Sequence, residues 1–124
     1  MNIVLIFLGG GIGSVSRFLL SSAVQRAAGE GFPFGTFTVN MIGCFLIGIL
    51  WAISGRVALP FALSLFLFVG ILGGFTTFSS FGIESFSLMH DGAWRTALLY
   101  VVLTNVLGLG LAAAGFHLTT YFTG

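Results

Sequence analysis

Charged residues are scarce in this chain, and lysine is absent altogether. Of the 124 residues only 6% are charged, whereas 57% are hydrophobic and the mean hydropathy is +1.15. A soluble domain carries about 25% charged residues, so the composition excludes an ordinary soluble protein and predicts a chain that lies in a lipid bilayer. The net charge of +1 is also too small to indicate a nucleic-acid partner.

Cysteine and histidine are too few for the sites that they usually build. Cys44 is the single cysteine and lies within an apolar run, so it cannot form an internal disulfide and is expected to pack as a small hydrophobic group. His90 and His117 form no recognisable metal or catalytic set with the three acidic residues of the chain. We therefore do not expect an enzyme.

Four apolar segments are long enough to cross a bilayer, which takes about 20 residues. They cover about residues 3–27, 36–54, 60–89 and 93–121, and the connections between them are short. Residues 1–124 are therefore predicted to form a single all-α membrane domain of four transmembrane helices. The first segment has no charged side chain before Arg17 and continues beyond it, unlike a signal peptide, so we interpret it as a retained helix.

The third segment contains the run Gly73-Gly74-Phe75-Thr76-Thr77-Phe78-Ser79-Ser80-Phe81. Lipid offers no hydrogen-bond partners to the backbone, so a helix can break near Gly73 only beside protein or an aqueous cavity. Glycine-interrupted membrane segments are typical of sites for ions or substrates. Hydroxyls and aromatic rings follow the glycines, and the next acidic side chain along the segment is Glu84. This chemistry favours an anion. The alternative is a small-residue surface for close helix packing.

Arg17 lies about 14 residues into the first segment, well inside the bilayer. Intramembrane charges are rare and usually face a cavity or a partner, so Arg17 is a candidate for a fixed positive charge in an aqueous vestibule. It could instead be a structural cation, bonded to backbone carbonyls or paired with Glu84 in the same half of the membrane. Gly9 and Gly13, four residues apart, would let another helix approach closely.

Polar side chains on two other helices could continue a path through the membrane. Residues spaced four apart share a helix face. Thr36 and Asn40 do so on the second helix, and Tyr100, Thr104 and the gap at Gly108 do so on the fourth. Phe78 and Phe81 could offer the positive edges of their rings to an anion. Each polar residue alone is more often an interhelical hydrogen bond than a ligand, but together with the broken helix they predict an anion path.

The arginines give little guide to orientation in the membrane. Arg56 would lie on one side with both termini, and Arg26 and Arg95 on the other. Orientation normally follows an excess of Lys and Arg on the cytoplasmic side, and here that excess is nearly absent. The chain could insert in both directions and form an antiparallel dimer, or one arginine could suffice to orient it.

These residues resemble the Fluc (CrcB-type) fluoride ion channels over essentially the whole chain. The motifs that carry the resemblance are Gly10, Gly11 and Gly13 followed by Arg17; Gly35-Thr36 leading to Val39-Asn40 and Gly43; and the run from Gly73 to Phe81. The resemblance implies a dual-topology, antiparallel homodimer in the inner cell membrane. It further implies two antiparallel pores at the subunit interface that export fluoride passively and lower its cytoplasmic level.

The resemblance also implies roles for single residues. The pore would be lined by Phe78, Phe81, Asn40, Ser79, Thr36, Tyr100 and Thr104. Arg17 would lie in a vestibule and Glu84 near the pore. The backbone carbonyls of Gly73 and Thr76 would hold one structural Na⁺ at the dimer centre, as suits a hard cation. Gly108 stands where some members have serine, so the contribution of this position is open.

Two other functions are compatible with a four-helix membrane protein. A small multidrug-resistance exporter is also short and often antiparallel, but it needs an acid within the first helix, where this chain has Arg17 and no acid. A non-conducting accessory subunit would use its glycine and phenylalanine surfaces only to bind partner helices. Such a subunit needs no track of hydrogen-bond donors.

Overall fold

The computed structural model describes residues 1–124, and all of its regular structure is helical. Three helices are continuous: α1 (Asn2–Ala28), α2 (Phe34–Ser54) and α6 (Trp94–Thr123). The third crossing is assembled from α3 (Phe61–Ser64), the π-helical η1 (Leu65–Leu72), α4 (Gly73–Phe75) and α5 (Phe78–His90). All four crossings are long and apolar enough to span a membrane, as predicted, and their ends lie within one or two residues of the predicted ones.

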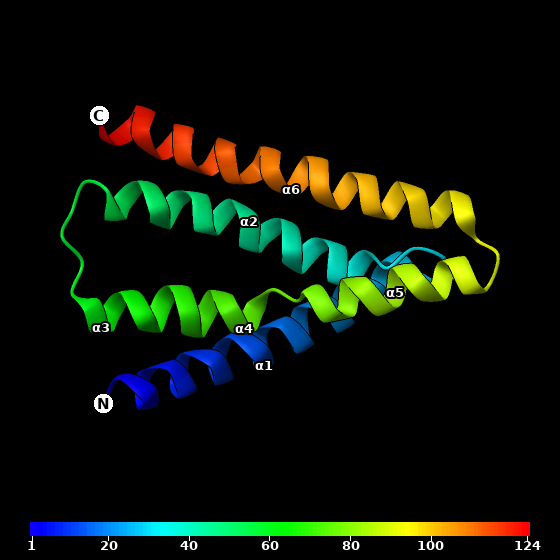
Figure 1. Ribbon diagram of the computed structural model, residues 1–124, viewed down its shortest axis with the longest axis horizontal. Helices are drawn as coiled ribbons and strands as arrows, with labels where there is room; N and C mark the ends of the chain where they lie inside the picture. The colour runs from blue at the N-terminus through cyan, green and yellow to red at the C-terminus, as the bar shows by residue number, and fades with distance from the viewer.

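The four crossings run alternately up and down (Figure 1). Both termini and the loop between α2 and α3 lie at one end of the molecule, and the other two loops lie at the opposite end. The α2 helix packs along α6, whereas α1 packs along η1 and α4. The first half of the third crossing therefore packs against α1, and its second half, α5, packs against α6.

Glycines bring α1 into backbone contact with the third crossing. A side chain on Gly9 would lie 2.7 Å from the Phe66 carbonyl oxygen and 3.0 Å from the α-carbon of Gly70. One on Gly74 would lie 2.6 Å from the Gly10 carbonyl oxygen. The prediction that Gly9 and Gly13 permit close approach is confirmed, because both are buried in this contact. Close packing also explains Gly74, the second glycine of the interrupted run.

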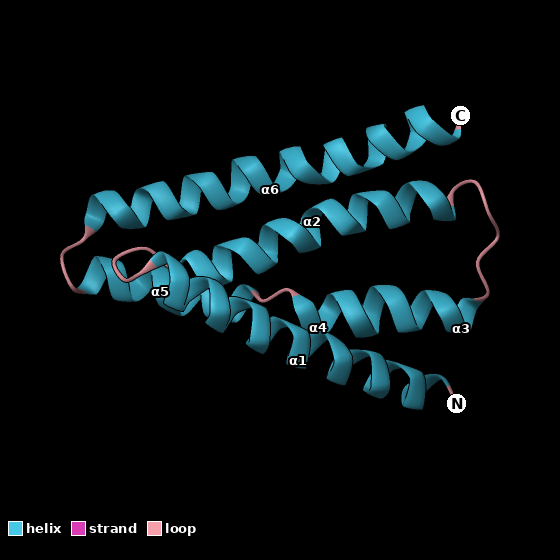
Figure 2. Cartoon of the chain, turned by 180° about the vertical axis from the view of Figure 1, so that it is seen from behind, coloured by secondary structure: helices cyan, strands magenta, loops and turns pink.

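The third crossing is broken just beyond the two glycines, close to the predicted position. Gly73 and Gly74 are helical, and the chain becomes extended only at Thr76 (φ −92°, ψ 157°) and Thr77 (φ −149°, ψ 117°). Figure 2 shows this break as a short loop between α4 and α5. The break lies three residues beyond Gly73, because Gly74 packs within the helix against α1. The new helix starts from the Thr77 hydroxyl, which accepts a bond of 3.1 Å from the Ser80 amide.

Candidate functional site

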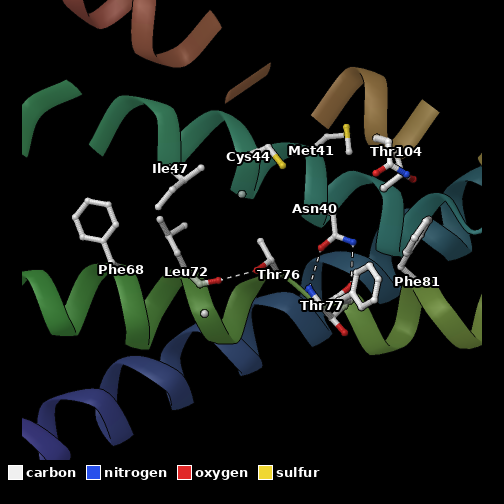
Figure 3. Close-up of a pocket in the computed structure, with 14 residues that line it drawn as sticks. Asn40, Met41, Cys44, Ile47, Phe68, Leu72, Thr76, Thr77, Phe81 and Thr104 are labelled. Carbon is white, nitrogen blue, oxygen red and sulfur yellow. Dashed lines mark hydrogen bonds between the residues drawn. The ribbon is translucent and has the colours of Figure 1, made fainter. Parts of the chain in front are cut away.

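A cavity of about 400 Å³ lies beside the break, between the third crossing and the α2–α6 pair (Figure 3). Fourteen residues line it, none of them charged. The predicted site residues among them are Asn40, Gly73, Thr76, Phe78, Phe81 and Thr104. The cavity thus brings together residues from three separate segments of the sequence. Thr36, Ser79, Tyr100 and Gly108 are not among its lining residues.

The side chain of Asn40 hydrogen-bonds to the backbone at the break in the third crossing. Its side-chain oxygen accepts from the Thr77 amide at 2.9 Å, and its side-chain nitrogen donates to the Thr77 carbonyl at 3.1 Å. Figure 3 shows both bonds. The Asn40 amide therefore replaces the hydrogen bonds that Thr77 loses when the helix unwinds, which lipid could not do. One amide hydrogen of Asn40 remains for another acceptor.

The break also frees backbone carbonyls. In a continuous helix the Thr77 amide would bond to the Gly73 carbonyl, and the Ser80 amide to that of Thr76. Here the Thr77 amide bonds to Asn40 and the Ser80 amide bonds to the Thr77 hydroxyl. Gly73 and Thr76 both border the cavity. Oxygen atoms released in this way are suitable ligands for a hard cation, so these two residues fit the predicted Na⁺ site.

Arg17 is half-buried on α1 and reaches across to the same region. Its Nε donates to the Gly74 carbonyl at 3.0 Å. Of the two structural alternatives left open for Arg17, the structure contains the bond to a backbone carbonyl. The carboxyl group of Glu84 has other partners, so the predicted alternative of an Arg17–Glu84 pair is absent.

Glu84 binds two hydroxyl groups that were predicted to serve an anion. The Thr36 hydroxyl donates to Glu84 Oε2 at 2.8 Å, and the Tyr100 hydroxyl donates to Oε1 at 2.9 Å. Thr36 is 8% exposed and Tyr100 is fully buried. Because a hydroxyl has a single hydrogen to donate, both groups are occupied in this arrangement and are not directed at the cavity.

The other predicted pore residues differ in their exposure and in whether they have hydrogen-bond partners. The Thr104 hydroxyl oxygen is buried, lines the cavity and has no hydrogen-bond partner. Phe81 is 8% exposed and packs against Tyr100, whereas Phe78 is 82% exposed. The Ser79 hydroxyl lies 3.3 Å from that of Thr77, outside the lining of the cavity. Thr104 is therefore the one predicted pore residue whose buried hydroxyl has no hydrogen-bond partner.

Comparison with known proteins assigns the chain to a family. The family model described as "CrcB-like protein, Camphor Resistance (CrcB)" matches residues 4–116, which is most of the chain. The chain belongs to the CrcB family. Proteins named "Fluoride-specific ion channel FluC" are similar to it over most of both lengths. The protein from Phocaeicola vulgatus is 43% identical over 108 residues, covering 87% of this chain and 89% of the relative.

Two further relatives carry the same name. The protein from Bacteroides fragilis is 45% identical and 98% of each chain is covered, and that from Magnetococcus marinus is 46% identical with 91% and 92% covered. The resemblance inferred from the motifs is thereby confirmed. With its four spanning helices, this CrcB-family chain is a multi-pass membrane protein.

Sequence reasoning missed two features of the site. Thr77 was not singled out, although a threonine three residues before Ser80 at the start of a helix is a capping signal. Gln25 was also missed: its side chain makes two hydrogen bonds to the loop that follows α1 and one to the first turn of α2. The signal for it was weak, since only the loop glycines marked that segment as a tight turn.

Proposed function

We propose that this protein is a fluoride-selective channel that lets fluoride leave the cell passively through the inner membrane. Its relatives are named fluoride-specific ion channels, and the site has the chemistry that such an ion needs. Fluoride is small and strongly hydrated, so a pore must replace the O–H groups of water with other donors. Neutral hydroxyls, amides and ring edges do this without trapping the ion.

The observation that carries this proposal is the uncharged cavity beside the broken helix. It contains the unpartnered hydroxyl of Thr104, the remaining amide hydrogen of Asn40 and the ring of Phe81. A buried hydroxyl without a partner is costly in a protein interior, and an acceptor such as fluoride would satisfy it. A surface that served only to bind partner helices would have no need for this donor.

The proposal includes a second copy of the chain in the opposite orientation. Phe78 is 82% exposed although it borders the cavity, so a partner that covers it would complete the wall of the pore. In an antiparallel homodimer the two cavities would give two oppositely directed pores. The freed carbonyls of Gly73 and Thr76 would hold the structural Na⁺ at the dimer centre, where it would neutralise acceptors that otherwise lack donors.

Transit beyond the cavity would involve Glu84. Thr36 and Tyr100 donate to its carboxyl oxygens, and in this proposal they donate to fluoride when the carboxyl group turns away. Arg17, near the break, would raise the local concentration of the anion. Ser79 would add a donor at the subunit interface, next to the exposed Phe78.

The test is ion efflux from liposomes that contain the purified protein. A fluoride electrode should record fast release of fluoride, while a chloride electrode records little release of chloride. Equal leakage of the two ions, or no release of either, would contradict the proposal. Phe81→Ile and Asn40→Asp should lower the fluoride rate while the protein keeps its oligomeric size, and unchanged rates would remove these residues from the path.

A further inference from the structure

A row of aromatic rings leads from the cavity to the surface of the molecule. The ring centroids of Phe78 and Phe81 are 5.7 Å apart, and Phe81 meets Tyr100 at 5.1 Å in an edge-to-face arrangement. Tyr100 in turn meets Phe32 at 5.3 Å, with the ring planes at 79°. The first three rings were predicted to serve an anion path. Phe32, in the loop between α1 and α2, is the fourth ring and was not predicted.

Phe32 borders a second cavity, of about 370 Å³, at the loop end of the bundle. In Figure 2 the loop that carries Phe32 lies against α5. The same cavity is lined by all three acidic residues of the chain, Glu30, Glu84 and Asp91. Carboxylates repel an anion, so an ion that leaves Tyr100 in this direction needs a favourable contact before it reaches water. A ring edge carries partial positive charge and provides one.

Gln25 holds the loop that carries Phe32. Its Nε2 donates to the carbonyls of Gly29 at 2.6 Å and of Phe32 at 3.0 Å, and its Oε1 accepts from the Gly35 amide at 3.0 Å. Gly29 and Gly31 have φ of 92° and 100°, which side chains rarely permit. One side chain near the end of α1 thus bonds to the loop at two carbonyls, including that of Phe32 itself, and to the first turn of α2.

We infer that Phe32 forms the outer end of the anion path and that Gln25 is the positioning residue that keeps its ring against Tyr100. The inference rests on the proposed function, because it extends the path proposed there from the central cavity to the surface. Phe34, the first residue of α2, also contacts Phe32, with ring centroids 4.8 Å apart, and supplies a matched control.

The experiment compares fluoride efflux from liposomes for variants of the full chain. Phe32→Leu should lower the rate by about three- to tenfold, the value of one lost aromatic contact, whereas Phe32→Tyr and Phe34→Leu should stay near the wild-type rate. Pentafluorophenylalanine at position 32 keeps the shape of the ring but reverses the polarity of its edge, so it should lower the rate as leucine does. Wild-type rates for both Phe32→Leu and the fluorinated ring would overturn the inference.

Gln25 is tested through its dependence on Phe32. Gln25→Leu should lower the rate, and the double variant with Phe32→Leu should be no slower than Phe32→Leu alone, because the two residues act through one ring. A merely structural role of Gln25 would make the two losses multiply, and that result would overturn its assignment. If the wild-type protein releases no fluoride, the proposed function fails; if it does and the Phe32 variants match it, only this inference fails.

Discussion

Replacing Asn40 with leucine tests whether one side chain stabilises the break in the third crossing. Leucine has the same number and branching of side-chain heavy atoms as asparagine, but it neither donates nor accepts a hydrogen bond. Asn40→Leu therefore removes both bonds to Thr77, of 2.9 Å and 3.1 Å, and leaves the cavity wall otherwise filled. Asn105 lines the same cavity but donates to its own helix, to the Val101 carbonyl at 2.8 Å. Asn105→Leu is therefore the matched control.

The expected size of the effect follows from the two lost bonds. An interhelical hydrogen bond in a membrane contributes about 0.6 to 2 kcal/mol. Thr77 borders the cavity, where water can partly replace the lost partner, so we expect a total near the lower part of the range for two bonds, about 2 kcal/mol. That free energy corresponds to about a thirtyfold change in an opening equilibrium.

Amide hydrogen exchange at Thr77, followed by NMR of the protein in micelles, measures this quantity directly. Exchange at Thr77 should be about thirty times faster in Asn40→Leu, since its amide has lost its acceptor. In Asn105→Leu it should change by less than about twofold, as for a substitution that leaves the break untouched. Exchange at Thr77 that is equally protected in Asn40→Leu would refute the argument that Asn40 replaces the lost helical bonds.

Three further predictions concern packing and ion binding. Gly13→Ala should destabilise the protein by about 1–3 kcal/mol in thermal unfolding, because its new methyl group would meet the Phe75 amide nitrogen at 2.9 Å, whereas Gly11→Ala has open space and should be neutral. Gly108→Ser should lower the free energy of unfolding by less than about 1 kcal/mol, since only the movable ends of the Cys44 and Met41 side chains lie near, at 3.3 and 3.4 Å. Gly115→Ser, whose side chain would meet backbone atoms, should lower it by more in the same thermal unfolding measurement. Replacing Na⁺ by a bulky organic cation should lower the unfolding temperature if the freed carbonyls hold Na⁺, and an unchanged temperature would contradict that site.

Much of the fold was predictable because the bilayer leaves few choices. A run of apolar residues in lipid can satisfy its backbone only as a helix, so the number of crossings and their ends follow from hydropathy. The glycines of α1 were predictable for a similar reason, since small residues four apart permit backbone contact. The exact place of the break was not, because Gly73 and Gly74 suit both an unwound chain and a close contact, and only the partner helix decides between them.

The sequence predicted which polar residues share a helix face, but it did not predict their hydrogen-bond partners. Spacing placed Thr36 on one helix face with Asn40, and Tyr100 on one with Thr104; Asn40 and Thr104 line the cavity beside the break, whereas Thr36 and Tyr100 contact Glu84. Spacing cannot tell which acceptor a hydroxyl chooses. Glu84 comes seven residues after Thr77, so its position on α5 brings it between Thr36 and Tyr100 only once α2 and α6 are packed.

This arrangement has a consequence for how an anion would cross the bundle. The hydroxyls of Thr36 and Tyr100 each donate to Glu84, so an anion that replaces the carboxyl group as acceptor leaves the number of hydrogen bonds unchanged. On the proposed route the barrier would then be set by the reorientation of Glu84 and by the repulsion between two acceptors at close range, and not by broken bonds. Thr104 lacks a partner and the Phe32 ring contacts Tyr100 on its other side. Glu84 would therefore be the one point on the proposed route where an existing contact must be exchanged.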